Sequence, residues 1–156
     1  MRTSGKLQID PGTLDAGNGG AEIEIVVPYT ERALTAAVLQ RASVLTAGLN
    51  ASIRLVAIHA VPYPLPFHCP AAEHAHLVER LVDLASRCPS SVAPEVVLAR
   101  YRDEGFRHVL KPASIVLIGA RKRFWPTREE KLARALARDG HMVVLVHLEE
   151  KETRNA

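Results

Sequence analysis

The chain has few aromatic residues, few cysteines and no long apolar run, and each of these scarcities excludes a class of protein. Aromatic residues make up only 4% of the 156 residues, so a buried core has to be built from aliphatic side chains. The two cysteines, Cys69 and Cys88, are too few for a disulfide-stabilised scaffold, and we expect both to be reduced thiols. No apolar run reaches the roughly 18 residues that a bilayer-spanning helix needs, so we expect no membrane insertion.

The ends of the chain are polar and lack the pattern of a targeting segment. Residues 1–20 contain no apolar stretch of the kind found in secretory signals, which predicts a cytoplasmic protein. Their glycine, asparagine and aspartate content predicts a flexible tail, and residues 150–156 predict a charged tail. Residues 21–149 are then one domain. The net charge of +3 suits an anionic ligand but is too small to indicate binding to nucleic acid.

Strand-like apolar segments alternate with helix-like segments through the whole domain. The predicted strands are residues 22–28, 52–61, 94–101, 113–120 and 141–148. Such an alternation indicates right-handed crossovers and a parallel sheet that is covered by helices on both faces. The simplest arrangement is a doubly wound, three-layer α/β/α fold with strand order 3-2-1-4-5. In such a fold, ligands bind at the carboxyl edge of the sheet between strands 1 and 4.

More detailed expectations concern single elements. Thr30 is placed to cap the first helix, which Gly48 and Asn50 would end. The buried face of this helix is predicted from helical spacing: Leu34, Val38, Leu45 and Leu49. The polar strand 94–101 is expected at an edge of the sheet, and the most apolar strand, 113–120, is expected to be central, with a neighbouring strand on each side.

Three segments of the chain resemble, in the same order, three parts of the sequences of the universal stress protein family. The stretch VVPYTERALTAAVLQRASVLTAGLNASIRLVAIHAV is similar to the family's first strand, long Ala-rich helix and second strand. ASIVLIGARKR resembles its fourth strand and the start of its ligand loop, and LARALARDGHMVVLV resembles its last helix and strand. The resemblance covers residues 22–148. It implies the fold that this family shares with adenine nucleotide alpha hydrolase-like proteins, and a non-catalytic regulatory role in the response to stress.

Members of that family that bind ATP carry Gly-x2-Gly-x9-Gly-Ser/Thr after the fourth strand and an aspartate after the first. Glycines allow backbone N–H groups to approach the phosphates, and a helix N-terminus adds a favourable dipole. Of the glycines, only Gly119 is present, and Lys122 replaces the second. Glu130 stands where the last glycine of the motif would be, and the loop is about three residues short. The aspartate's place falls near Thr30, just after Pro28, so Pro28, Thr30 and Gly119 are candidate ligand-binding residues at the strand ends.

The start of the last helix also argues against a phosphate. Thr127 and Glu130 are spaced as a capping box, in which each side chain bonds the backbone N–H of the other residue. A helix start capped by its own side chains has fewer free donors, and the carboxylates of Glu129 and Glu130 would repel a triphosphate. We therefore predict that ATP binding of the usual kind is lost and that no cofactor is required.

A basic loop is the main remaining candidate for a ligand site. Its cationic residues are Arg121, Lys122, Arg123 and Arg128. In one interpretation they form a nucleotide or anion site at the mouth of the sheet, with Phe124 and Trp125 stacking on a planar ligand. In the other, which we favour, the loop is a solvated surface on which Trp125 packs down as a lid.

The histidines and cysteines offer a weaker metal hypothesis. His68, Cys69, His74 and His76 lie close together in the sequence, and imidazole and thiolate are zinc ligands. His74 and His76, however, are two positions apart at the start of a predicted helix and so point to different faces. We favour solvated histidines and expect no metal site.

The remaining histidines, His59, His141 and His147, lie near predicted strand ends. A hydrogen-bonded structural role is favoured for them, and no spacing in the chain indicates a catalytic triad or an acid–base pair, so we predict a non-enzymatic protein.

The last strand, MVVLVHL, is apolar although it is predicted to lie at an edge. An uncovered apolar edge strand is an aggregation hazard. The family resemblance implies that this strand pairs antiparallel with its mate in a homodimer, as a twofold contact. The interface residues would be Met142, Val144, Val146 and Leu148. A further protein or small-molecule partner is expected, which the sequence does not identify.

Overall fold

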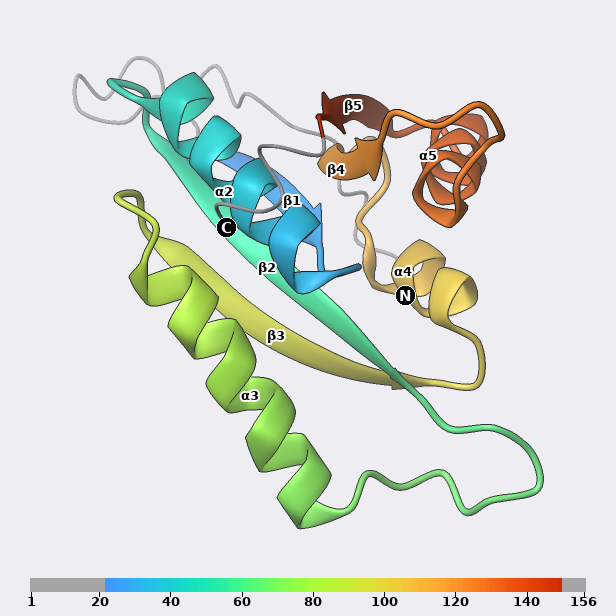
Figure 1. The fold of residues 1–156 in the computed structure, drawn as a ribbon. Coiled ribbons are helices and arrows are strands. Elements are labelled where there is room, and N and C mark those ends of the chain that lie inside the picture. Colours follow the sequence, from blue (N-terminus) through green and yellow to red (C-terminus); the bar gives the residue numbers. More distant parts are fainter. Residues whose placement is uncertain (1–21, 150–156) are drawn as a thin grey trace.

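The computed structural model describes residues 22–149, which form one five-stranded parallel sheet with four helices packed on it (Figure 1). The strand order is β3-β2-β1-β4-β5, which confirms the predicted fold and order. The strands are β1 (Ile23–Pro28), β2 (Ala51–Ala60), β3 (Val92–Ala99), β4 (Ile115–Arg121) and β5 (Met142–Leu148). The helices are α2 (Arg32–Thr46), α3 (Ala71–Ser86), α4 (Arg102–Val109) and α5 (Arg128–Arg138). The predicted tails, 1–20 and 150–156, lie outside the described residues.

The helices divide into two layers because the direction of the crossovers reverses once. The connections β1–β2 and β2–β3 run one way across the sheet, and the connection β4–β5 runs the other way. One core therefore joins α2 and α3 to alternate residues of β2 such as Ile53 and Leu55. The other core joins α4 and α5 to the intervening residues such as Val56. Both cores are aliphatic except for Phe106, as the scarcity of aromatic residues predicted.

The first helix ends just before Gly48, which has a φ of 76°, as predicted, but its start and its buried face differ from expectation. Thr30 does not cap it: its backbone N–H donates to Thr35 Oγ1 at 3.3 Å, and Glu31 occupies the N-cap position without a side-chain cap. Leu45 and Leu49, predicted to be buried, are each more than half exposed. Their places are taken by polar residues whose hydroxyls find partners inside the structure, such as Thr46, which donates to Ala42 O at 2.8 Å. Because α2 buries these hydroxyl-bearing residues, its buried face is rotated about the helix axis from the face that the spacing of apolar residues predicts.

The most apolar strand lies inside the sheet, as predicted: β4 has β1 on one side and β5 on the other. β4 is almost completely buried, because helices on opposite faces of the sheet, α2 and α5, both contact it. The polar strand β3 does lie at an edge, as predicted, and it accommodates Pro94 there. No helix within residues 22–149 is long and apolar enough to cross a membrane.

The contact between α2 and β4 depends on Gly119. A Cβ atom at this position would lie 2.7 Å from Val38 Cγ2, closer than real Cβ contacts allow, and 3.2 Å from Leu34 O, which is tighter than most. The glycine therefore lets the backbone of β4 approach the helix, and this packing role explains its presence without any phosphate.

We predict that Gly119→Ala destabilises the protein by about 1–3 kcal/mol, the usual cost of overpacking a core. Urea unfolding measures the change. If the clash with Val38 is the cause, the same substitution costs less in a Val38→Ala background, where the obstructing methyl groups are absent. Equal costs in the two backgrounds would contradict this account.

His141 is a structural residue at the entrance to β5. It is buried, and its Nδ1 accepts a hydrogen bond from the backbone N–H of Ser114 at 3.2 Å. Burial lowers the pKa of His141 from its ordinary value of 6.5, although the nearby Asp139 opposes the shift. The imidazole is thus held neutral in the folded protein, as the expected structural role requires.

This environment predicts a component of stability that acid removes. The unfolded chain binds a proton at His141 near pH 6.5 while the folded chain resists it, so the free energy of unfolding falls as the pH drops below about 6.5. Unfolding between pH 7 and pH 5 should show a shallower decline for His141→Asn, whose side-chain oxygen can still accept from Ser114. His108→Asn, at an exposed site beside Glu104, is the control and should retain the wild-type slope. Identical slopes for all three proteins would disprove the assignment.

Candidate ligand site at the carboxyl edge of the sheet

The predicted site lies where the carboxyl ends of β1 and β4 meet. Pro28, the last residue of β1, is buried, and Tyr29 N–H continues the pairing by donating to Val56 O at 2.7 Å. Only residues 29–31 separate β1 from α2, so the helix begins directly over this edge. The turn is as short as the sequence suggested, and it places Glu31 at the first position beyond it.

Glu31 forms a two-point ion pair with Arg121 at the end of β4. Arg121 Nη1 and Nη2 donate to the two carboxylate oxygens of Glu31, the parallel geometry in which arginine binds carboxylates most strongly. The hydrogen bond from Arg121 lowers the pKa of Glu31 below its usual range, and the charges of Arg121 and Arg123 act in the same direction. The pair links residues that are 90 positions apart in the sequence.

The ion pair changes what this edge can bind. Arg121, one of the four predicted cationic site residues, has its guanidinium engaged by a carboxylate. In addition, the N-terminus of α2, which would otherwise attract an anion, carries the negative charge of Glu31. Sequence analysis placed the missing aspartate near Thr30 but did not find this partner for Arg121, because nothing local relates the two residues.

The loop between β4 and α5 holds the other predicted residues. Thr127 Oγ1 accepts from Glu130 N–H at 3.2 Å, which confirms the capping role of Thr127. The Glu130 carboxylate, however, lies 3.7 Å from His147 Nε2 on β5. Arg128 is exposed in the first turn of α5, beside the acidic pair of that turn.

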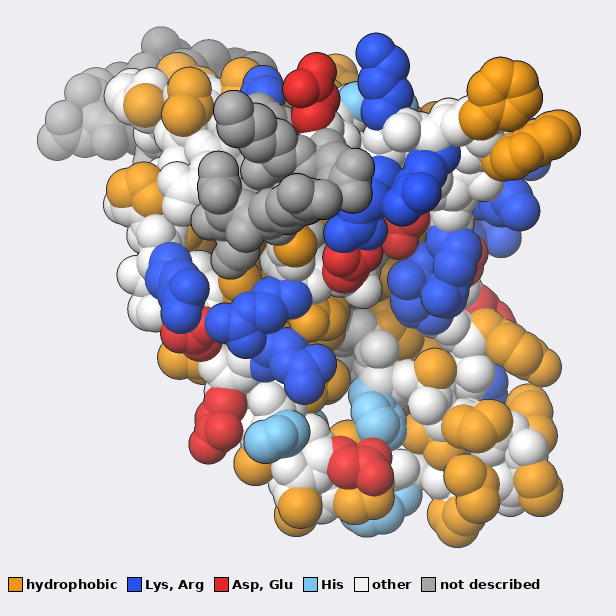
Figure 2. Space-filling model, in the orientation of Figure 1, with side chains coloured by type: hydrophobic (Ala, Val, Ile, Leu, Met, Phe, Trp, Pro, Cys, Tyr) orange, Lys and Arg blue, Asp and Glu red, His pale blue; other side chains and the backbone are white. Residues whose placement is uncertain are grey.

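The aromatic residues of this loop project into solvent. Phe124 is 94% exposed and Trp125 is 76% exposed, and their rings meet edge to face with centroids 5.6 Å apart. The expectation that Trp125 packs down as a lid was therefore wrong. Lys122 and Arg123 are exposed beside them. In Figure 2, basic and protruding hydrophobic side chains gather at the upper right, over the β4–α5 loop of Figure 1.

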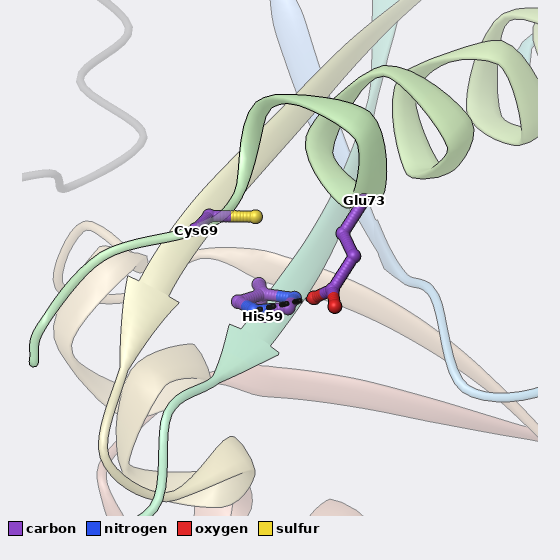
Figure 3. Close-up of side chains that lie close together, drawn as sticks. All are labelled: His59, Cys69 and Glu73. Carbon is purple, nitrogen blue, oxygen red and sulfur yellow. Dashed lines mark ion pairs between the residues drawn. The ribbon is translucent and has the colours of Figure 1, made fainter. Parts of the chain in front are cut away.

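A second group of chemically active side chains lies at the end of β2. Ligand atoms of His59, Cys69 and Glu73 all lie within 4.8 Å of one another (Figure 3). Of the residues in the predicted metal hypothesis, Cys69 alone belongs to this group; His76 lies 4.0 Å from Glu79 instead. His74 and His76 point to different faces of one helix, but this argument does not concern His59, which lies on β2. The sequence did indicate that His59 is near the carboxyl end of a parallel strand, which is the edge of the sheet where the next helix begins.

No family model matches this sequence, and no curated protein matches it. Solved structures do match the fold. A universal stress protein from Archaeoglobus fulgidus superposes with a TM-score of 0.57 at 14% identity, covering 80% of this chain and 93% of that one. A protein from the universal stress protein family of Burkholderia pseudomallei superposes with a TM-score of 0.53 at 18% identity, covering 80% of this chain and 94% of the other.

The chain has the fold of the universal stress proteins. The likeness extends over nearly the whole length of both matched structures and agrees with the strand order derived above. Within this fold, Gly119 of the fourth strand packs against α2, and the edge beyond it holds the Glu31–Arg121 ion pair.

The last strand of the universal stress protein fold here has an apolar outer part. Met142 and Val144 are exposed at 63% and 41%, and Val146 packs partly against the α2 side of the core. Leu148 is buried within the chain itself. Among residues 22–149, β5 pairs only with β4, so its other edge carries no described strand.

Proposed function

We propose that this chain is a non-catalytic regulatory protein of the universal stress protein kind, which works in the cytoplasm as a homodimer and does not bind ATP in the usual way. The fold supports the general class. The observation that carries the specific proposal is the Glu31–Arg121 ion pair across the ends of β1 and β4.

Charge explains why this edge disfavours a triphosphate. Glu31 occupies the Arg121 guanidinium that a phosphate would otherwise bind, and the first turn of α5 adds the carboxylates of Glu129 and Glu130. Each exposed like-charge contact costs about 1 kcal/mol in water at contact distance. The basic residues of the loop offset part of this cost, but Arg121 already has a carboxylate partner. No glycine of the β4–α5 loop supplies backbone donors, because residues 120–127 contain none.

The proposal predicts that ATP does not raise the melting temperature of the full chain, with or without Mg²⁺, and that the purified protein releases no nucleotide on denaturation. Thermal unfolding at millimolar ATP and mass spectrometry of released small molecules test this. A rise of several degrees, or stoichiometric nucleotide in the released fraction, would defeat the proposal.

An alternative is a nucleotide- or anion-binding protein that uses the basic loop 121–128 in place of glycines. The exposed Phe124–Trp125 pair beside Lys122 and Arg123 favours it, because solvent-exposed aromatic rings next to cations suit a planar anionic ligand. Binding of AMP or ATP would then be salt-sensitive and lost in Lys122→Ala/Arg123→Ala. The control Arg80→Ala/Lys111→Ala removes the same charge elsewhere and should bind normally.

The proposed dimer uses the outer edge of β5. An antiparallel mate would satisfy the backbone groups of this edge and cover Met142 and Val144. The same patch then serves both copies around a twofold axis.

We predict that Val144→Lys converts a dimer to a monomer, since a charged side chain at an edge strand opposes strand pairing. Light scattering should give twice the 17.1 kDa chain mass for the wild type and a single mass for the variant. Val82→Lys is the matched control, because Val82 is a similarly exposed valine on α3. A monomeric wild type, or a variant that remains dimeric, would rule out this interface.

A further inference from the structure

We propose that His59, Cys69 and Glu73 bind a zinc ion at the end of β2. The three side chains come from a strand, the following loop and the first turn of the next helix. Figure 3 shows the Cys69 thiol and the Glu73 carboxylate converging on the His59 ring. Within the described part of the chain, this is the one group of three such side chains whose ligand atoms come this close together.

The parallel sheet itself brings the ligands together. Side chains alternate along β2, and Ile53, Leu55 and Ala57 face the core formed with α2 and α3. His59 continues this series two positions further on, so its ring points to the side on which α3 packs. α3 begins at the same edge, which places Glu73 over the ring with Oε2 3.7 Å from Nε2.

The loop that carries Cys69 is held against the end of β3 by Arg100. Arg100 Nη1 donates to Val61 O at 3.2 Å and to Leu65 O at 2.8 Å. The guanidinium also lies 4.3 Å from the ring centroid of Tyr63 and 5.0 Å from that of Phe67. One side chain thus contacts the loop at four places along its length. This bracing limits the conformational entropy lost when Cys69 closes on a metal.

The donor set selects the class of metal. Thiolate and imidazole are ligands of zinc and related transition metals, whereas Ca²⁺ and Mg²⁺ require oxygen ligands. Ligand atoms around a tetrahedral zinc lie about 3.4–3.7 Å apart, given bonds of about 2.0–2.3 Å. For a nitrogen and an oxygen ligand the spacing is about 3.3–3.6 Å, so the His59–Glu73 distance of 3.7 Å needs to shorten only slightly. All three ligand atoms lie within 4.8 Å of one another, and the Glu73 side chain, which is 63% exposed, has room to adjust its position.

Charge and proton balance are simple at this site. On binding, the Cys69 thiol gives its proton to the buffer, His59 binds as the neutral imidazole, and Glu73 binds as the carboxylate. The two negative ligands neutralise Zn²⁺. Three protein ligands leave a fourth position for water, which is the pattern of open zinc sites.

The zinc site is separate from the proposed function. It uses no residue of the β1–β4 edge and none of β5, so the outcome of the ATP and dimer experiments does not bear on it.

Cobalt substitution tests the site directly, using the full, tag-free chain freed of metal with a chelator. Co²⁺ should bind once per chain and give a thiolate-to-metal charge-transfer band together with the intense visible bands of a tetrahedral complex, and Zn²⁺ should displace it. Cys69→Ser should abolish the charge-transfer band. Cys88→Ser is the matched control and should retain it, because Cys88, the chain's other cysteine, contacts Ser43 at 2.7 Å, away from the cluster. Absence of the band in the wild type, or its survival in Cys69→Ser, overturns the proposal.

A second measurement separates ligation by His59 from a general effect of surface histidines. His59→Gln and Glu73→Gln should each weaken Zn²⁺ binding by at least about tenfold in competition with a chromophoric chelator. His76→Gln and Glu79→Gln, which alter a similar His–Glu pair on the exposed side of α3, should leave the affinity unchanged. Melting temperatures in chelator establish that the variants fold. Equal affinities for the two sets of variants in folded protein overturn the assignment of these ligands.

Discussion

The close contact between α2 and β4 is the constraint from which the rest of the site follows. Gly119 allows the helix to lie directly on the strand, and two residues later β4 ends at Arg121. The three-residue turn after β1 starts the same helix over the same edge. Glu31 and Arg121 thus meet because of backbone geometry that is fixed in the core, and not because either side chain reaches far. The chemistry of the edge is a consequence of helix–strand packing.

The carboxyl edge of the sheet carries two different kinds of chemistry. At the β1–β4 junction, a carboxylate and a guanidinium satisfy each other, and exposed aromatic and basic side chains lie beyond them in the loop. At the end of β2, a thiol, an imidazole and a carboxylate converge without a strong mutual bond, since their closest ion pair spans 3.7 Å. Glu31 and Arg121 are already bonded to each other, whereas His59, Cys69 and Glu73 lie close together without strong bonds between them and could all bind one metal ion.

The fold could be predicted from the sequence because it depends on features that repeat. Alternating strands and helices imply crossover connections between parallel strands, and the polar sequence of β3 correctly predicted that this strand lies at an edge of the sheet. The details that failed depend on single side chains. Leu45 is exposed because buried hydroxyls such as that of Thr46 rotate the inner face of α2, and Thr30 bonds through its backbone instead of capping. Hydropathy treats a serine or threonine as polar and does not register that its hydroxyl can be satisfied locally.

The candidate sites were harder to predict for a related reason. The ion pair joins residues 90 positions apart, and His59 stands ten residues before Cys69, with three prolines between them. Spacing rules for metal ligands work along one element, as with His74 and His76. They cannot show that a residue at the end of a strand lies close to a residue of the following helix, because this depends on which face of the sheet the helix packs against. Only the assembled fold supplies that information.

The shortness of two connections has a consequence for how this fold could acquire a phosphate-binding loop. Residues 29–31 are the whole link between β1 and α2, and residues 122–127 are the whole link between β4 and α5. An insertion in residues 29–31 alone would move Glu31, the N-cap of α2, but would add no backbone N–H groups in the β4–α5 loop to bind a phosphate. An insertion in residues 122–127 alone would add such groups opposite the carboxylate of Glu31. With these lengths, a glycine-rich phosphate loop of the usual kind would require changes in both connections.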